Sequence, residues 1–233
     1  MHYLFSNIKY LLRGEQRDEE DFYASLGISH ETIFQLVTGN ASPSPEQLML
    51  IADALGRNID ELLRNDLSRF EQLNHSLKMF VMDVDGVLTD AGMYYTDSGL
   101  EIKKYNAKDG MAIMRLEKNG VRTGMLSHGF NRTLIKSRAE MLGVSHYYTG
   151  QEKKWDVLES WLSKSEITPE ETVYIGDDIN DLAVMKRVGL SAAPADAAKT
   201  VKKHADLVLK TPGGHGCVRE LAELLFPDFF SEP

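Results

Sequence analysis

The sequence lacks several features that would assign it to a specialised class of protein. It contains one cysteine, Cys217, in 233 residues, which excludes an internal disulfide framework and a cysteine-rich metal site. It has no repeat and no low-complexity segment, and no apolar run of the roughly 18 to 20 residues that a bilayer span requires. The N-terminal MHYLFSNIKYLL has neither a charged start nor a small-residue cleavage site. These absences predict a cytoplasmic globular protein.

Surplus positive charge is also missing. The formal net charge is -9 at pH 7, whereas proteins hold phosphate backbones mainly with surplus Lys and Arg. The balance argues against a general polyanion binder. It leaves room for a small anionic substrate that is held together with a metal ion.

The chain divides into two halves of different pattern. Residues 1–66 predict short helices separated by turn signals, and within 44–64 the apolar positions recur at helical spacing with a break at Gly56. Residues 67–78 are interpreted as a connector. From 79 to 233, the short apolar runs KMFVMDV, RTGMLS, TVYIGDD and ADLVLK alternate with helical segments. This alternation indicates an α/β domain with a parallel sheet and crossover helices.

The N-terminal pattern is specific enough to resemble a known family. The stretches ASLGIS, TGNASPSPEQL and IADALGRNIDELL resemble the Cro and lambda-repressor-like helix-turn-helix proteins over most of residues 6–66. The resemblance implies a turn at Gly27 and a recognition helix over 29–38, which in that family lies in the major groove of DNA.

The charge of this half leaves two functions open for it. Residues 1–66 contain five Lys and Arg against eleven Asp and Glu, and the segment SHETIFQLVT contains no basic residue. Phosphate contacts supply most of the non-specific affinity for DNA. The half is therefore interpreted either as a DNA reader or as a helical module for subunit assembly or partner binding.

The stretch FVMDVDGVLTD, residues 80–90, places two carboxylates at the end of an expected buried strand. Asp83 and Asp85 are two residues apart, so both can face the carboxyl edge of the sheet, where open α/β folds bind ligands. Carboxylates this close repel unless a cation or a shared proton lies between them. A calcium loop is excluded because Val87 and Tyr94 occupy positions that need a polar ligand and a glutamate.

A second acidic cluster, TVYIGDDINDLAVM, repeats the plan about ninety residues later. Asp177, Asp178 and Asp181 follow another expected strand and a glycine. Oxygen ligands favour a hard cation, and a phosphate-bearing substrate favours Mg²⁺ in particular. Together the two clusters predict a magnesium site.

With both clusters in place, residues 77–226 resemble the haloacid dehalogenase superfamily of phosphohydrolases. More narrowly, they resemble the subfamily of 3-deoxy-D-manno-octulosonate 8-phosphate phosphatases and 9-phosphononulosonate phosphatases. The narrower resemblance rests on DVDGVLTDAGMYY, KKYNAKDGMAI, RAEMLGVSHYYTGQEKK, YIGDDINDLAVMKRVGLSAAPADA and GGHGCVRE. It implies a Rossmann-like fold in which a small β-hairpin replaces the cap domain.

The resemblance also implies roles for four aspartates. Asp83 would be the nucleophile that forms an aspartyl-phosphate, and Asp85 would be the general acid and base. Mg²⁺ would be held by Asp83, the backbone carbonyl of Asp85, and Asp177, with help from Asp178.

Two further positions carry alternatives. Ser127 would bind the transferring phosphoryl group, but this chain reads SHGF where the family has Thr or Ser, then Gly, then Arg or Glu. His128 is therefore an alternative occupant of that position and a candidate substrate contact. Lys154 would pair with the nucleophile and the phosphate, with Lys153 as the fallback.

The remaining expected substrate contacts lie on the hairpin side and near the C-terminus. MYY and EIKKY flank TDSGL and predict the hairpin. In the subfamily four subunits assemble so that neighbours shield each other's sites, which implies a homotetramer. Residues expected near the substrate are Thr89, Asn106, Asp109, Gly110 and His215, where His215 stands in a position that is often Arg or Glu in relatives.

Two functional hypotheses follow. The first is a Mg²⁺-dependent phosphatase for a phosphorylated sugar acid of cell-envelope (lipopolysaccharide) biosynthesis, either an octulosonate or a nonulosonate. The second is a sugar-phosphate-responsive DNA-binding regulator whose output is the helix-turn-helix half. A phosphotransferase or mutase of the same superfamily would ordinarily need a larger cap than this hairpin.

Overall fold

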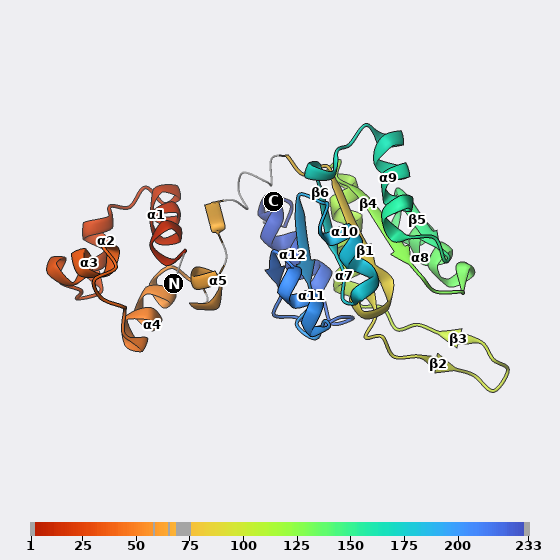
Figure 1. The fold of residues 1–233 in the computed structure, drawn as a ribbon, viewed down its shortest axis with the longest axis horizontal. Coiled ribbons are helices and arrows are strands. Elements are labelled where there is room, and N and C mark those ends of the chain that lie inside the picture. The colour runs from red at the N-terminus through yellow and green to blue at the C-terminus, as the bar shows by residue number, and fades with distance from the viewer. Residues whose placement is uncertain (1–2, 58, 65, 69–75, 231–233) are drawn as a thin grey trace. The chain divides into compact units, whose positions relative to one another are not determined.

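The computed structural model describes residues 3–57, 59–64, 66–68 and 76–230 and divides into two compact units, residues 1–72 and 73–233 (Figure 1). The predicted boundary at residue 66 stays a prediction, and residues 69–75 of the predicted connector lie outside the described part of the chain. Among the described residues, no helix has both the length and the apolar character needed to cross a bilayer.

The first unit is all helical, as predicted. Its helices are α1 (Leu4–Gly14), α2 (Glu19–Ser25), α3 (His30–Val37), α4 (Pro45–Ala54) and α5 (Ile59–Arg64). Side-chain caps set where they begin: Asp18 accepts from two backbone N–H groups of α2, and Ser29 accepts from Thr32 N of α3. Ser44 forms a capping box with Gln47 at α4. The predicted turn before α3 is present at Gly27, whose φ is +69°.

The second unit is built on a six-stranded parallel sheet in the order β5-β4-β1-β6-β7-β8. The strands are β1 (Met79–Asp83), β4 (Arg122–Ser127), β5 (His146–Thr149), β6 (Thr172–Ile175), β7 (Leu190–Ala193) and β8 (Leu207–Val208). Apolar side chains of β1, Met79 to Met82, are fully buried because both faces of the sheet are covered. The predicted α/β fold is confirmed.

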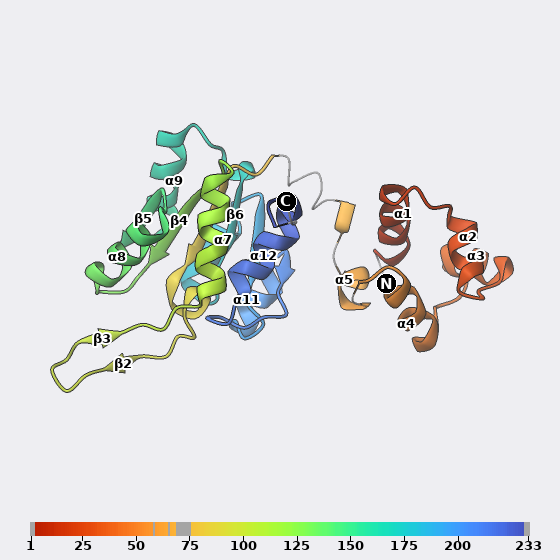
Figure 2. The same ribbon diagram turned by 180° about the vertical axis from the view of Figure 1, so that it is seen from behind.

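Helices cover the sheet on both faces. The main ones are α7 (Ala107–Lys118), α8 (Arg132–Leu142), α9 (Lys154–Ser165), α10 (Leu182–Met185), α11 (Lys199–His204) and α12 (Cys217–Leu225). Opposite views place α7, α8 and α12 on one face and α9, α10 and α11 on the other (Figures 1 and 2). Short helical turns also occur at η1 (Val84–Leu88), η2 (Pro169–Glu171), η3 (Ile179–Asp181) and η4 (Pro227–Phe229).

A small hairpin projects from the second unit as a thin arm (Figure 2). It consists of β2 (Tyr94–Tyr95) and β3 (Glu101–Ile102), which pair antiparallel with Tyr94 opposite Ile102. The turn closes through Thr96 N, which donates to Leu100 O at 2.9 Å. The predicted hairpin is therefore present, and we refer to residues 93–102 as the arm.

The strand order fixes where a ligand can bind. From β1 the chain runs to β4 and β5 on one side, and later to β6, β7 and β8 on the other. The order thus reverses between β1 and β6, and such a switch point opens a crevice at the carboxyl ends of the two strands. Asp83 ends β1, and Asp177 follows β6 by two residues.

Candidate active site

Asp83 is held at the end of β1 with its carboxylate at the crevice. Its side chain is buried, with 4% exposed, and its Oδ1 accepts from Val84 N at 2.7 Å. The chain then turns sharply at Gly86, whose φ is +93°. A Cβ at Gly86 would collide with the carboxylate of Asp177. Glycine here therefore lets the two acidic clusters come together.

Lys154 connects these clusters from the first position of α9. Its Nζ lies 2.8 Å from Oδ1 of Asp83 and 2.6 Å from Oδ1 of Asp181, with 1% of its side chain exposed. Lys153 is the exposed residue that precedes the helix. Of the two lysines that the sequence left open, Lys154 is the one placed at Asp83.

Asp181 organises the second cluster, although the sequence motif gave it no role. It is fully buried, and its Oδ1 accepts from Tyr174 Oη at 2.5 Å as well as from Lys154. Its Oδ2 accepts from the backbone N of Asp177 at 2.9 Å and of Asp178 at 3.1 Å. Four donors therefore occupy this carboxylate, which makes it an anchor for the loop that carries Asp177.

The electrostatics of the cluster show an excess of buried negative charge. Burial raises the pKa of Asp83 well above its usual value, although the adjacent Lys154 opposes the shift. Burial, and then the charge of Asp181, raise the pKa of Asp177 to about 7. Burial alone would lower the pKa of Lys154, but the charges of Asp83 and Asp181 outweigh it and raise that pKa. One ammonium does not neutralise three carboxylates.

The donor set fits a hard cation. One oxygen each of Asp83, Asp177 and Asp181 lies within 4.8 Å of the other two. Oδ1 of Asp177 is buried and has no hydrogen-bond partner in the described part of the chain, whereas both oxygens of Asp181 are occupied. Such all-oxygen clusters suit Mg²⁺ or a similar ion. The available lone pairs belong to Asp83 and Asp177.

Asp178, the fourth predicted ligand, faces a different partner. Its Oδ1 accepts from Ile179 N at 2.7 Å and caps η3. It lines the cleft described below, but it does not belong to the cluster of close carboxylate oxygens.

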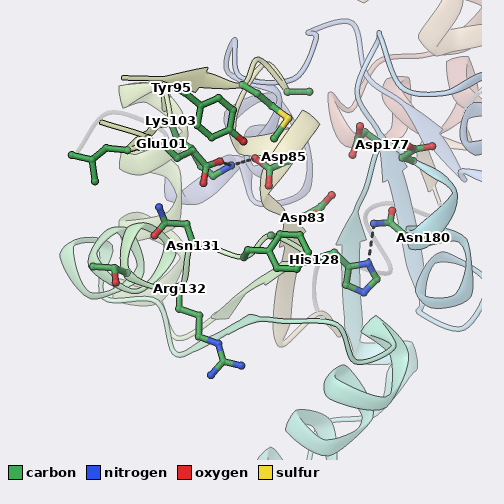
Figure 3. Close-up of a pocket in the computed structure, with 18 residues that line it drawn as sticks. Asp83, Asp85, Tyr95, Glu101, Lys103, His128, Asn131, Arg132, Asp177 and Asn180 are labelled. Carbon is green, nitrogen blue, oxygen red and sulfur yellow. Dashed lines mark hydrogen bonds and ion pairs between the residues drawn. The ribbon is translucent and has the colours of Figure 1, made fainter. Parts of the chain in front are cut away.

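A cleft of about 880 Å³ opens above Asp83 and Asp177. Its floor consists of the two acidic clusters, one wall is the arm, and the other is the loop after β4 (Figure 3). Arm and adjacent residues that line it include Met93, Tyr95, Leu100, Glu101 and Lys103, and the loop contributes His128, Gly129, Phe130, Asn131, Arg132 and Thr133. The cleft combines charged and apolar surfaces.

Asp85 lies beside Asp83 but has different partners. Lys103 Nζ forms an ion pair with its Oδ1, and Ser127 Oγ donates to its Oδ2 at 3.5 Å. Ser127 ends β4, is 1% exposed and accepts from Gly129 N at 2.9 Å. Burial would lower the pKa of Lys103, but its hydrogen bonds to Asp85 and Glu101 outweigh this and raise it. The sequence assigned no role to Lys103, although this residue begins the motif KKYNAKDGMAI.

His128 lies at the rim of the cleft next to η3. Its Nε2 is 2.9 Å from Glu152 O, and its Nδ1 is 3.3 Å from Asn180 Nδ2 (Figure 3). A ring with its proton on Nε2 satisfies both contacts, because the carbonyl must accept and the amide can donate. These two contacts fix the orientation of the ring.

The other predicted substrate contacts do not line the cleft within this chain. Thr89 is buried and accepts from Ala91 N at 3.3 Å, and Asn106 caps α7 while Nδ2 donates to Gly214 O at 3.4 Å. Asp109, 1% exposed, accepts from Arg219 N at the start of α12. Gly110 faces Arg138 and Leu142. Within this chain these residues therefore make contacts with the protein itself.

His215 lies on a loop that reaches the turn after β1. It is exposed, and its Nδ1 is 2.7 Å from Gly213 O. Gly214 N donates to Val87 O at 2.8 Å, and a Cβ at Gly213 would collide with Gly86 O. The GGHG sequence therefore packs closely against the turn that carries Asp85.

In the first unit, helix α3 presents little that could neutralise the phosphates of DNA. This helix contains no Lys or Arg and exposes Phe34 and Val37, by 63% and 53%. His30 contacts Glu20 at 3.3 Å. The helix that would enter a major groove therefore has an apolar and acidic surface.

Comparison with known proteins identifies both units. Residues 126–221 match the haloacid dehalogenase-like hydrolases, and residues 10–62 match a helix-turn-helix family. The chain is 37% identical over 150 residues to the 3-deoxy-D-manno-octulosonate 8-phosphate phosphatase of Escherichia coli strain K12. That match covers 64% of this chain and 79% of the relative.

Solved structures agree with this assignment. A 3-deoxy-D-manno-octulosonate 8-phosphate phosphatase from Yersinia pestis has a TM-score of 0.66 at 33% identity and covers 70% of this chain and 87% of its own. The enzyme of the same description from Moraxella catarrhalis, in complex with magnesium ion, phosphate ion and a KDO molecule, has a TM-score of 0.66 at 29% identity, with coverages of 69% and 91%. The chain therefore belongs to the haloacid dehalogenase superfamily as a phosphatase of the 3-deoxy-D-manno-octulosonate 8-phosphate phosphatase group, with a helix-turn-helix domain at its N-terminal side.

Proposed function

We propose that this phosphatase is Mg²⁺-dependent and hydrolyses the phosphate monoester of a sugar acid through an aspartyl-phosphate on Asp83. The observation that carries the proposal is the placement of Asp83. Its buried carboxylate lies at the switch point, 2.8 Å from Lys154 Nζ, and lines a cleft that also contains Asp85. A nucleophile and a separate proton donor are thus two residues apart on one turn.

In the first step, a carboxylate oxygen of Asp83 attacks phosphorus as the ester P–O bond breaks. Asp85 gives its proton to the leaving sugar oxygen. In the second step, Asp85 takes a proton from water, the water oxygen bonds to phosphorus, and the acyl-phosphate bond breaks. Inorganic phosphate leaves and Asp83 is restored.

Lys154 and Ser127 support the phosphoryl group in this scheme. The ammonium of Lys154 offsets the charge of Asp83 before attack and the charge of the phosphoryl oxygens during transfer. The hydroxyl of Ser127 lies between Asp85 and Gly129 N, a position from which a small rotation brings it to a phosphoryl oxygen. His128 contacts the leaving group at the rim.

Asp83, Asp177, the backbone carbonyl of Asp85 and, through a water, Asp178 would hold the Mg²⁺. When bound, this ion screens the repulsion between the attacking carboxylate and the phosphate dianion. The buried oxygen of Asp177 without a partner supports this assignment, as does the magnesium ion in the Moraxella catarrhalis relative. Asp181 remains hydrogen-bonded to the protein.

The relatives and the size of the cleft support a proposal for the substrate class. We assign 3-deoxy-D-manno-octulosonate 8-phosphate, or a 9-phosphorylated nonulosonate, as the substrate, used in the cytoplasm for cell-envelope (lipopolysaccharide) biosynthesis. About 880 Å³ is ample for a sugar acid of this size. The cleft wall that would contact the sugar contains His128 and the arm.

The arm supports a homotetramer. Met93, Tyr94, Tyr95, Leu100 and Ile102 are each at least 50% exposed, which is unfavourable for a thin hairpin surrounded by water. In the tetramer, arms of neighbouring subunits would cover each other's clefts and bury this surface. His215, which is exposed in the single chain, would then face a neighbouring site.

The test is a phosphate-release assay with the purified full chain and Mg²⁺ across a panel of sugar phosphates. The expected result is a preference for the two sugar-acid phosphates over neutral hexose phosphates. Folded protein that releases no phosphate from either sugar acid would end the proposal.

A second candidate function, a sugar-phosphate-responsive DNA regulator, is favoured by the helix-turn-helix match over residues 10–62. The acidic balance and the exposed apolar side chains of α3 favour an assembly or partner-binding module. A salt-dependent gel shift on a selected operator separates the two functions. Binding no tighter than to random DNA would exclude the regulator.

A further inference from the structure

Lys103 lies directly after β3, where the arm joins the rest of the second unit. Only 7% of its side chain is exposed, and it turns into the cleft toward Asp85 (Figure 3). The next residue, Lys104, is 61% exposed and reaches Asp90 at 3.4 Å. Two adjacent lysines therefore have opposite environments, and one of them faces the reaction site.

The burial of Lys103 is balanced by two carboxylates. Its Nζ forms ion pairs with Asp85 Oδ1 and, at 2.8 Å, with Glu101 Oε1, whose side chain is 15% exposed. An ammonium taken out of water is costly unless it is paired in this way. Glu101 belongs to β3, so the arm itself supplies the second partner and keeps the lysine extended toward Asp85.

Asp85 is consequently held from two sides. Lys103 contacts one carboxylate oxygen, and Ser127 Oγ donates to the other at 3.5 Å. In the proposed reaction the same carboxyl group must first give a proton to the leaving oxygen and then take one from water. Both transfers require the group to stay within hydrogen-bond reach of the substrate.

We propose that Lys103 is a positioning residue, which fixes the carboxylate plane of Asp85 through their ion pair and so ties the acid–base step to the arm. This inference rests on the proposed phosphatase function. Lys103 touches neither the attacking oxygen nor phosphorus in this scheme. Glu101 acts on Asp85 through Lys103.

Substrates with different leaving groups distinguish a positioning role of Lys103 from simple substrate binding. A sugar alkoxide is a poor leaving group and needs the proton of Asp85, whereas p-nitrophenolate leaves without one. A residue that positions the acid should therefore matter for the first substrate and little for the first turnover of the second. A lysine that bound the phosphate would matter for both.

The experiment compares Lys103→Met, Lys103→Arg and the matched control Lys104→Met in the full chain with Mg²⁺. For Lys103→Met we expect kcat on the sugar-acid phosphate to fall about 10- to 100-fold, with KM within about twofold. First-turnover release of p-nitrophenolate should stay within about threefold. Lys103→Arg should recover most of the loss, and Lys104→Met should match the wild type.

Several outcomes would overturn the inference. They are an unchanged kcat in Lys103→Met, equal losses on both substrates, or a loss confined to KM. If Lys103→Met does not fold, Glu101→Gln replaces it as the test variant. Its kcat on the sugar-acid phosphate should fall by a smaller factor, again with little change in the first-turnover release of p-nitrophenolate. A folded wild type without activity on any phosphomonoester would instead remove the proposed function, and this inference with it.

Discussion

Replacing Lys154 by Met removes the ammonium that contacts both Asp83 and Asp181 and leaves a side chain of similar length. The two carboxylates are 4% and 0% exposed, so water compensates poorly for the lost cation. Removing one partner of a buried ion pair typically costs about 3 to 5 kcal/mol, because the remaining charge is left uncompensated. Against a typical domain stability of about 5 to 15 kcal/mol, this is a large fraction.

The direction of the pH dependence follows from the same contacts. Burial already holds the pKa of Asp83 above its usual value, and Lys154 opposes that shift. Without the lysine the carboxylates take up protons more readily, so the penalty of Lys154→Met should be largest at alkaline pH and shrink as the pH falls. Mg²⁺ should reduce the penalty by supplying another cation.

The assay can isolate the second unit. Both tryptophans of the chain, Trp155 and Trp161, lie on α9, so tryptophan fluorescence during urea unfolding reports this unit alone. The matched control is Lys164→Met on the exposed last turn of the same helix, which should change the free energy of unfolding by only about 0.5 kcal/mol. A loss below about 1 kcal/mol in Lys154→Met would refute the assigned pairing.

Three further predictions follow from the structure. Burial raises the pKa of Asp109 from 3.8 to about 6, so its contribution to stability is full below about pH 4 and is lost as the pH rises through 6. Between pH 4 and 7, wild type should lose about 2 kcal/mol relative to Asp109→Asn in urea unfolding, and parallel profiles would contradict this. Mg²⁺ should raise the Tm of wild type, and the increase should be larger at pH 8 than at pH 6, because a proton competes with the ion at Asp177, whose pKa is about 7. Asp177→Asn should abolish this increase in Tm, and an undiminished increase would refute the assignment of Asp177 as a ligand. Leu100→Glu with Ile102→Glu, at side chains 66% and 52% exposed, should dissociate the assembly in light scattering, whereas an unchanged mass would exclude the arm as an interface.

Much of the fold could be predicted from hydrophobic runs. The runs at KMFVMDV, RTGMLS, TVYIGDD and ADLVLK correspond to β1, β4, β6 and β8. The strands β5 (HYYT) and β7 (LSAA) gave no comparable signal, because neither forms a long apolar run. Sheet order depends on packing between distant elements, which single-sequence patterns do not specify.

The site, too, could be predicted from the sequence only in part. Asp83, Asp85 and Asp177 could be placed because strand ends of a parallel sheet share one edge. Lys103 could not, because a long side chain reaches Asp85 across 18 positions of sequence without any spacing rule. Asp109 carried a motif-based expectation of a substrate contact, but in the structure its carboxylate holds the start of α12, 110 positions away. Asp181 had one local signal, its position four residues after Asp177 at the start of a helix.

The central claim is that Asp83 is the nucleophile of a sugar-acid phosphatase. Its most direct test is phosphate release from 3-deoxy-D-manno-octulosonate 8-phosphate and from a 9-phosphorylated nonulosonate, with Mg²⁺, by wild type and Asp83→Asn. The account predicts turnover of one of these substrates by wild type and a loss on the order of 10⁴ or more in the variant. Comparable phosphate release by folded Asp83→Asn, or none from either substrate by folded wild type, would contradict it.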